Sequence, residues 1–260
     1  MNLTVCINNH NYGRYLKAAV ESALGQTAAS EVIVVDDGSS DISHAVAGEF
    51  ATEPRVRFLS TENRGQLAAL IAGIESSRTE YLCFLDADDR LRPNHIEILG
   101  TAFASHTQCG IAWTRHENSD GSPREADGFP HGMIGPGAML TQLTWNKPRT
   151  ITSCLGIRRR NFEFLSSLPA HILRQWMVRA DDCILIAGAL SGAMRYAAPE
   201  VTVDRTVHDC NRFFNNPAAR TPFERYRHTY ATAVFVNWVR RTLDIPEPNL
   251  PLLLIRHSNT

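Results

Sequence analysis

The chain has 260 residues, a formal net charge of −1 and 20 % charged residues of balanced sign. This balance excludes the strongly basic surface that is typical of nucleic-acid-binding proteins, and the composition as a whole shows no polybasic membrane patch. The length suits one α/β domain with a small C-terminal appendage.

Six cysteines lie far apart, mostly inside apolar stretches, and none forms a Cys-x-x-Cys pair. No secretory leader precedes the first predicted strand, so we expect reduced thiols in a cytoplasmic protein. No apolar run approaches the roughly 18 residues that a membrane-spanning helix needs. The sequence therefore predicts no transmembrane segment, and it leaves peripheral contact with the inner face of a membrane open.

The first 115 residues alternate between short apolar runs and helical patterns. Helices are predicted by apolar residues at helical spacing, and one helix opens near Pro93 because proline suits a first turn. Strands that are apolar throughout and separated by helices indicate βαβ units in a largely parallel sheet with both faces covered. The predicted strands are 3–7, 31–35, 56–60, 81–85 and 110–114, and the other helices are 13–26, 41–50 and 63–77.

After residue 115 the regular alternation of predicted strands and helices ends. Residues 116–150 contain many glycines and prolines, which predicts a long loop that serves either as a substrate lid or as a plain surface excursion. A helix over about 173–190, a strand over 194–203 and a C-terminal helix over about 222–242 complete the expected elements.

Acidic residues follow two of the predicted strands. Asp36 and Asp37 end one strand, and Asp86, Asp88 and Asp89 end another about fifty residues later. The carboxyl ends of parallel strands meet at one edge of a sheet, where ligands of open α/β sheets bind. Crowded carboxylates repel one another, and Mg²⁺ or Mn²⁺ relieves this repulsion while also binding substrate phosphates. The pattern predicts a site for a metal-bound diphosphate.

Two other interpretations of the Asp-x-Asp stretch stay open at this point. The three acids can simply terminate a strand and cap the next helix. The haloacid-dehalogenase-like phosphatases also place Asp-x-Asp after an apolar strand, but usually the first strand and with Thr or Val following. The chain has no Walker phosphate loop and no Gly-x-Gly-x-x-Gly fingerprint, so a P-loop NTPase and a dinucleotide-binding dehydrogenase lack support.

In the order and spacing of its motifs, the segment 3–114 resembles the nucleotide-sugar-binding half of the family 2 glycosyltransferases, which have the GT-A fold. The resemblance rests on five features, which are Asn11-Tyr12, Gln26-Thr27, the run Val-Val-Asp-Asp-Gly-Ser-Ser-Asp at 34–41, the Asn63-x-Gly65 turn, and Asp86-x-Asp88 with Pro93 five residues later. The chain departs from many relatives at Asn8-Asn9, where they have Pro-Thr, and at Leu70-Ile71.

The resemblance implies a fold and a set of ligands. The fold is α/β of the GT-A type, a Rossmann-like and mostly parallel sheet flanked by helices, with an acceptor-side subregion and a helical tail. The donor would be a nucleoside-diphosphate sugar, with UDP or dTDP as the commonest nucleotides of the family and Mn²⁺ or Mg²⁺ as the cofactor. The implied nucleotide-sugar-binding residues are Asn8, Asn11, Asp37, Gly65, Asp86 and Ala87, and the implied metal ligands are Asp88, Asp89 and His208.

The second half of the chain supplies the expected base. Two acids that open a helix are commonly a favourable charge at the positive end of the helix dipole. The resemblance implies instead that the second acid of such a pair is the general base. If the apolar residues that follow set the position of the pair, it is Ala180-Asp181 and the base is Asp181. If the pair is Asp181-Asp182, the base is Asp182. We favour Asp181.

A further motif lies after the last predicted strand. The segment 204–211 resembles the Tyr-Arg-x-His-x-x-Asn segment of the family: His208 and Asn211 keep their spacing, whereas Thr206 replaces the arginine. A single histidine is also commonly an ordinary surface or core residue. Trp113, Trp145 and Trp176 would more often pack in a core than stack on sugars.

The sequence thus predicts three parts, namely a nucleotide-sugar half over 1–115, an acceptor-side half over 116–215 and a helical extension over 216–260. The predicted activity is metal-dependent transfer of a sugar, with inversion, to a carbohydrate, lipid-linked or other hydroxyl acceptor, in a setting such as polysaccharide biosynthesis. A catalytically silent nucleotide-sugar-binding protein and a metal-dependent phosphotransferase or phosphatase are the alternatives. Nucleic acid is not an expected partner.

Overall fold

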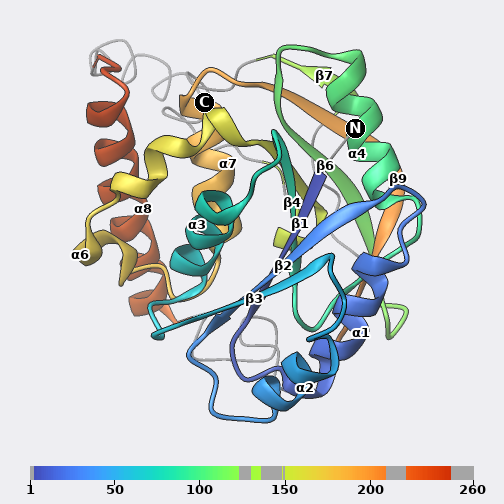
Figure 1. The fold of residues 1–260 in the computed structure, drawn as a ribbon. Helices are drawn as coiled ribbons and strands as arrows, with labels where there is room; N and C mark the ends of the chain where they lie inside the picture. Colours follow the sequence, from blue (N-terminus) through green and yellow to red (C-terminus); the bar gives the residue numbers. More distant parts are fainter. Residues whose placement is uncertain (1–2, 123–129, 136–147, 149, 209–220, 247–260) are drawn as a thin grey trace.

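The computed structural model describes residues 3–122, 130–135, 148, 150–208 and 221–246, and Figure 1 shows how they are arranged. Within these residues one sheet holds nine strands, which are β1 (Leu3–Asn9), β2 (Ser30–Asp37), β3 (Val56–Thr61), β4 (Tyr81–Asp86), β5 (Arg90–Leu91), β6 (Cys109–Asn118), β7 (Gly132–Ile134), β8 (Leu155–Arg158) and β9 (Met194–Arg205). The α-helices are α1 (Gly13–Leu24), α2 (Ser43–Glu49), α3 (Gln66–Ser76), α4 (His95–Ser105), α6 (Ala170–Leu173), α7 (Ala180–Leu190) and α8 (Pro222–Thr242).

The first part of the sheet is parallel, as the βαβ pattern predicts. The strand order is β3-β2-β1-β4-β8-β6-β9-β5, and the pairs β1–β2, β1–β4 and β2–β3 are all parallel. In the centre of this register Val5 lies opposite both Val32 and Cys83. The ends of β1, β2 and β4 therefore emerge at one edge of the sheet.

The remaining strands make the sheet mixed rather than uniformly parallel. Strand β8 is antiparallel to both β4 and β6, β6 is parallel to β9, and the short strands β5 and β7 are antiparallel to β9. Strand β8 was not predicted, because a stretch of four mostly apolar residues is too short to show the hydrophobic periodicity of a strand or of a helix. Segments from both halves of the chain thus share one sheet.

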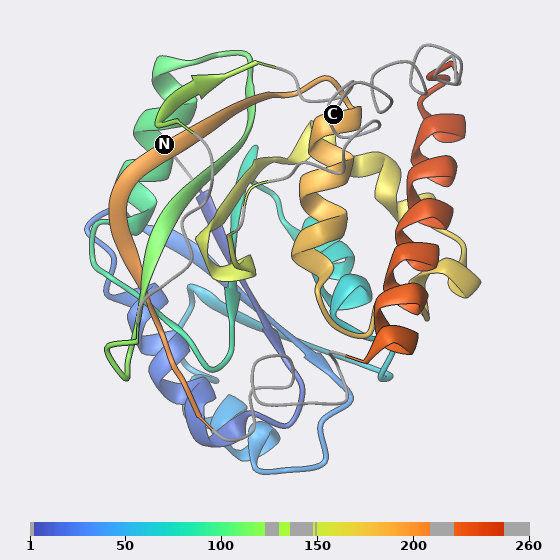
Figure 2. The ribbon, with the colours of Figure 1, turned by 180° about the vertical axis from the view of Figure 1, so that it is seen from behind.

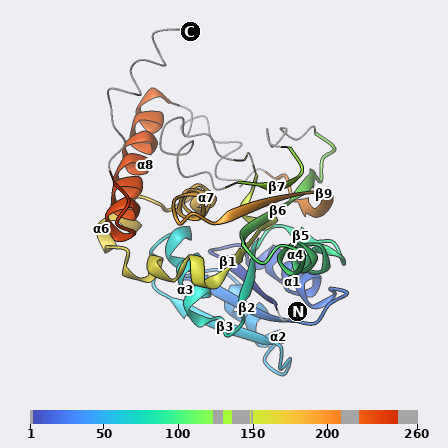
Figure 3. The same ribbon diagram turned by 90° about the horizontal axis from the view of Figure 1, so that it is seen from above.

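Helices cover both faces of this sheet, which confirms the predicted α/β class. Successive side chains of a strand point to opposite faces. Val5 and Ile7 accordingly pack with α1, α2 and α4, whereas Cys6 between them packs with α3 and α7 on the other face. Figure 2 shows α7 and α8 side by side, and Figure 3 shows α8 as the outermost helix on the side of α3 and α7.

Two predicted elements differ from the structure. The helix expected over 173–190 begins only at Ala180, because Arg179 adopts a left-handed φ of 64° and interrupts the helical path. The expected loop over 116–150 contains the end of β6 and the strand β7, and much of its remainder lies outside the described residues. The C-terminal helix matches its prediction from Pro222 to Thr242.

Of the cysteines and the three tryptophans named above, those that the structure describes are all buried. Cys6, Cys83, Cys109 and Cys154 are buried free thiols. Trp113 and Trp176 are both fully buried core residues, whereas Trp145 and Cys210 lie outside the described residues. No helix in the described ranges combines the length and apolar character that crossing a bilayer requires.

Candidate active site

Strand β4 ends in three carboxylates that gather at the edge of the sheet. Asp86 is its last residue, and a turn closed by a 3.0 Å hydrogen bond from Asp89 N to Asp86 O brings Asp88 and Asp89 beside it. One oxygen from each of the three carboxylates lies within 4.8 Å of the others. The predicted acidic cluster is therefore compact.

Burial and mutual repulsion make two of these carboxylates, Asp86 and Asp89, bind protons more strongly than ordinary carboxylates. Burial and then the negative charge of Asp88 raise the pKa of Asp86 to about 7, and the charge of Asp181 adds to this effect. Burial and the charges of Asp88 and Asp86 also raise the pKa of Asp89 well above its usual range. Because a divalent cation would remove the repulsion, the three carboxylates fit a site for Mg²⁺ or Mn²⁺.

His208 completes one side of the cluster. Its Nε2 lies 3.0 Å from Asp88 Oδ2, and its ring stacks on Tyr15 with 4.7 Å between ring centroids. Tyr12 lies on the same side, 5.7 Å from the imidazole. The structure thus brings His208 to the acidic cluster, 120 residues away in sequence from Asp88. Asn211 of the same motif lies outside the described residues.

Asp89 links the acidic cluster to the end of β9, the strand that precedes His208. Its Oδ2 accepts a 2.6 Å hydrogen bond from Ser153 Oγ, and its Oδ1 accepts a 3.0 Å bond from Thr206 N. Thr206 follows the end of β9 and lies two residues before His208. Asp89 therefore fixes the path of the 206–208 segment.

Asp86 is oriented by two amide side chains. Asn8 Nδ2 and Gln66 Nε2 both donate to Asp86 Oδ1, at 2.9 Å and 3.0 Å. The Oε1 atom of the same Gln66 accepts a 3.1 Å hydrogen bond from the backbone N of Ala180, the first residue of α7. One glutamine thus links the carboxylate cluster to the helix that carries the predicted base. The sequence reasoning missed Gln66, and its only signal was a polar residue opening an apolar helix.

The two acids at the start of α7 have different surroundings. Asp182 is buried, and its Oδ2 lies 2.8 Å from Arg179 Nη2 and 3.0 Å from His228 Nε2 on α8. Asp181 is half-buried, and its charge acts on Asp86 in the acidic cluster. Asp182 therefore lies in the protein interior, whereas the half-buried Asp181 is near enough for its charge to raise the pKa of Asp86.

Asp37 and Gly65 lie at the same edge of the sheet, where the turn before α3 packs against the segment before α7. The two carboxylate oxygens of Asp37 accept 2.8 Å hydrogen bonds from Arg64 N and Gly65 N. Gly65 has a φ of 94°, and a Cβ at this position would lie 2.8 Å from the Cα of Met177. Both residues thus hold α3 against the segment that precedes α7.

His10 is a second residue that the sequence reasoning missed. It follows β1, its Nδ1 lies 2.8 Å from the backbone O of Asp37, and its Nε2 lies 3.1 Å from Asn63 Nδ2. These contacts place an imidazole ring between two of the predicted motifs. The only sequence signal was its position directly after the first strand.

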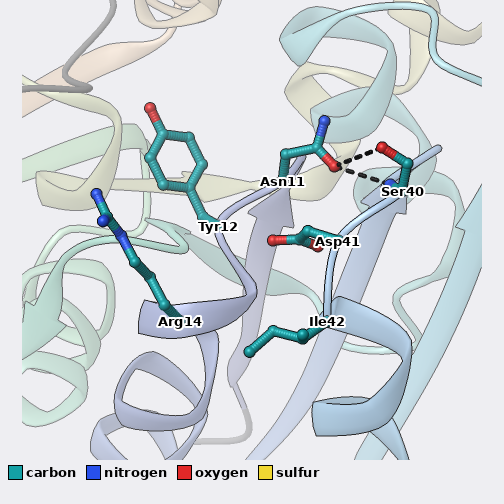
Figure 4. A pocket seen from close by; sticks show the side chains of 6 residues that line it. All are labelled: Asn11, Tyr12, Arg14, Ser40, Asp41 and Ile42. Atoms are coloured by element: carbon teal, nitrogen blue, oxygen red, sulfur yellow. Dashed lines mark hydrogen bonds between the residues drawn. The ribbon is translucent and has the colours of Figure 1, made fainter.

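Asn11 lines a cavity of about 600 Å³ between the start of α1 and the connection from β2 to α2. Figure 4 shows Tyr12 and Arg14 on one side of this cavity and Asp41 and Ile42 on the other. Asn11 Oδ1 accepts a 2.8 Å hydrogen bond from Ser40 N. The side chain of Asn11 therefore stabilises a wall of the cavity.

The predicted site residues thus fall into three groups. Asn8, Asp86, Asp88, Asp89 and His208 meet in one cluster, and the charge of Asp181 on α7 acts on its Asp86. Asp37, Gly65 and Asn11 lie at the same edge of the sheet and hold neighbouring loops in place. The side chains of Ala87 and Asp182 are buried, so Ala87 can offer only its backbone to a ligand.

Comparison with known proteins agrees with this arrangement. The model of the glycosyl transferase family 2 matches residues 4–165. An uncharacterized glycosyltransferase of Nostoc sp. is 27 % identical over 86 % of this chain and 70 % of its own length. Chondroitin synthase of Escherichia coli is 34 % identical over 52 % of this chain, which corresponds to 19 % of that much longer protein.

Solved structures share the fold at low sequence identity. The crystal structure of S. aureus TarS in complex with UDP aligns with a TM-score of 0.68 at 14 % identity, covering 94 % of this chain and 70 % of TarS 1-349. A complex of the same protein with UDP-GlcNAc aligns with a TM-score of 0.66. These alignments show a common GT-A architecture for the mixed sheet and its helices.

Proposed function

The chain belongs to the glycosyl transferase family 2 and is a glycosyltransferase, and from this premise we propose that it moves a sugar from UDP or dTDP to an acceptor hydroxyl. The observation that carries the proposal is the cluster of Asp86, Asp88, Asp89 and His208, which lies beside the start of α7 at the carboxyl edge of the sheet. This edge is where open α/β sheets bind their ligands.

The nucleotide lies, in this proposal, across the ends of β1 and β2. His10 offers a flat ring for stacking on the base, and the Asn63 side chain and the backbone oxygen of Asp37 are polar groups beside it. Asn8 and Asp86 continue the same edge towards the ribose and the sugar. The UDP complexes of TarS, a protein of the same fold, support a uridine nucleotide as the donor.

The diphosphate lies at the acidic cluster with Mn²⁺ or Mg²⁺. Asp88 and His208 would hold the cation, and Asp89 would keep the His208 segment in place. Oxygen and imidazole ligands in this combination suit Mn²⁺, and carboxylate oxygens suit Mg²⁺. When bound, the cation supplies positive charge where the departing diphosphate becomes more negative.

Asp181 acts as the general base on the acceptor side. The acceptor oxygen attacks the anomeric carbon, the bond from that carbon to the diphosphate breaks with its electron pair leaving on the nucleotide, and the acceptor proton passes to Asp181. A positioned base of this kind contributes about 10² to 10⁴ in rate. A single base opposite the leaving group favours single displacement with inversion.

The acceptor is proposed only as a class. Chondroitin synthase and hyaluronan synthase are among the relatives, and they cover 46 to 52 % of this chain. These relatives support a carbohydrate or lipid-linked acceptor in polysaccharide biosynthesis. A cytoplasmic location fits the supply of nucleotide sugars and the buried free thiols.

The experiment that tests this function combines binding with turnover. We expect UDP to raise the melting temperature only in the presence of Mn²⁺, and a panel of UDP-sugars to give UDP release with at least one member. Asp88→Ala should abolish the Mn²⁺-dependent shift, whereas the exposed Asp120→Ala control should not. Saturable UDP binding without release from any donor would favour the silent binding protein, and phosphate release from simple esters would favour a phosphatase.

A further inference from the structure

Large exposed hydrophobic side chains gather at one place on the surface. Of the seven among the described residues, Phe223, Tyr226 and Tyr230 lie on α8, with exposed fractions of 70 %, 70 % and 58 %. Met177 and Val178 lie on the loop before α7, and the adjoining Trp176 packs edge-on against His228 of α8 at 5.3 Å. Five of the seven therefore occupy the first half of α8 and the loop on which it packs.

The three aromatic residues form a stripe along α8. Their spacing of three and four residues puts them on one face of the helix, turned away from the buried side. The buried side consists of Ala231, Phe235 and Val239, which pack in the core beneath. Figure 3 shows α8 at the outer edge of the molecule. The exposed fractions of the three rings place the stripe on the solvent side of this helix.

The charge of α8 contrasts with that of the whole chain. Residues 222–242 contain four arginines and one glutamate, which gives a net charge of +3, whereas the whole chain has −1. Arg227 and Arg241 are exposed and share the face of the aromatic stripe, and Arg227 also pairs with Glu224 at 3.0 Å. Aromatic rings and arginines are residue types that bind at the interface of an anionic membrane.

The area of the stripe argues against a second copy of the chain as its occupant. Three aromatic side chains that are about two thirds exposed offer roughly 300–400 Å². A specific interface between two proteins needs about 800 Å² on each side. A membrane has no such requirement, because each aromatic ring and each arginine contributes to interfacial binding on its own.

From the aromatic stripe and its arginines, we propose that the outward face of α8, together with Met177 and Val178, docks on an anionic phospholipid surface. The inference goes beyond the proposed transfer reaction and does not depend on it. The 3.0 Å contact between His228 Nε2 and Asp182 Oδ2 joins the first half of α8 to the start of α7. The docked face would thus lie next to the N-terminal end of α7, the helix that carries Asp181.

Sedimentation with unilamellar vesicles tests the proposal on the full chain. We expect binding to vesicles of phosphatidylcholine with 30 % phosphatidylglycerol, roughly tenfold stronger than to phosphatidylcholine alone and weakened by salt. The triple variant Phe223→Ser, Tyr226→Ser, Tyr230→Ser should bind roughly tenfold less tightly. Arg227→Gln with Arg241→Gln should lose the preference for the anionic lipid. Ile42→Ser, on the far side of the sheet and 59 % exposed, is the matched control and should bind as the parent does.

Three results would overturn the proposal. One is parent protein that stays in the supernatant with anionic vesicles at low salt. Another is a triple variant that keeps its parent's circular dichroism and sediments equally well. The third is light scattering that shows a dimer of the parent and a monomer of the triple variant, because the stripe would then be an interface between copies.

Discussion

Gln66 donates a 3.0 Å hydrogen bond from its side-chain Nε2 to Asp86 Oδ1. The other end of the same amide accepts from Ala180 N, so the amide orientation is determined by a carboxylate on one side and a backbone N–H on the other. Gln66 therefore positions both the acidic cluster and the start of α7.

We expect Gln66→Met to slow UDP release from the best donor roughly 10- to 100-fold, because it removes a hydrogen bond to a charged group. UDP binding measured by calorimetry with Mn²⁺ should change little, so the loss should lie in kcat. Gln175→Met, at an exposed glutamine, is the control. An unchanged kcat in a folded Gln66→Met variant would contradict the positioning role.

The surroundings of Asp181 and Asp182 predict opposite consequences of their substitution. Asp182→Asn removes a buried charge that pairs with Arg179 and His228, and we expect a loss of about 3 kcal/mol of folding free energy. The melting temperature should fall by roughly 6–12 °C. Asp181→Asn should keep its melting temperature and lose about 10² to 10⁴ in turnover. A stable but inactive Asp182→Asn variant would make Asp182 the base.

Binding of Mn²⁺ should depend on pH because two carboxylates of the acidic cluster, Asp86 and Asp89, have raised pKa values. The pKa of Asp86 is raised to about 7, and that of Asp89 is also raised. Cation binding displaces these protons, so the apparent affinity should rise as the pH rises through 7 and fall roughly tenfold per pH unit below it for each proton displaced. Calorimetry at pH 6 in two buffers of different ionisation enthalpy measures the protons released. Affinity that stays constant from pH 5.5 to 8 would refute this prediction.

Substitution of Gly65 tests the close packing between the start of α3 and the segment before α7. Gly65→Ala combines a φ of 94° with a Cβ 2.8 Å from the backbone of Met177, and we expect a loss of about 2 kcal/mol or more in the free energy of unfolding. Gly100→Ala in α4 has open space around its new Cβ, and should be neutral or stabilising by up to about 1 kcal/mol. Urea denaturation of both variants measures the contrast. Equal urea midpoints for the two variants would show that position 65 tolerates a side chain.

Buried His95 should make the free energy of unfolding fall at acidic pH. Burial lowers its pKa from 6.5 to about 3, and its Nδ1 lies 2.7 Å from Thr202 Oγ1. Between these two pH values the unfolded chain takes up a proton that the folded protein does not, so stability falls as the pH falls, by about 1.4 kcal/mol per unit. His95→Asn keeps a polar partner for Thr202 and does not titrate. Denaturant unfolding from pH 7 to pH 4 should therefore show a shallower loss in the variant, and parallel curves would contradict the assignment.

The candidate site shows which features were predictable from local sequence. Asp86, Asp88 and Asp89 were predictable because three carboxylates directly after an apolar strand must emerge at the edge of the sheet. Gln66 and His10 were not, since each acts through partners far away in sequence. The different surroundings of Asp181 and Asp182 also depend on a distant partner, His228.

By itself the sequence determined the α/β class, the parallel strands β1 to β4 and the acidic edge, because hydrophobic period and turn residues act over neighbouring positions. The tertiary structure alone decided the insertion of β8 between β4 and β6, the contact of His208 with Asp88 and the outward face of α8. These features join segments separated by many tens of residues. Their energies come from contacts that exist only once the whole sheet and its helices have packed.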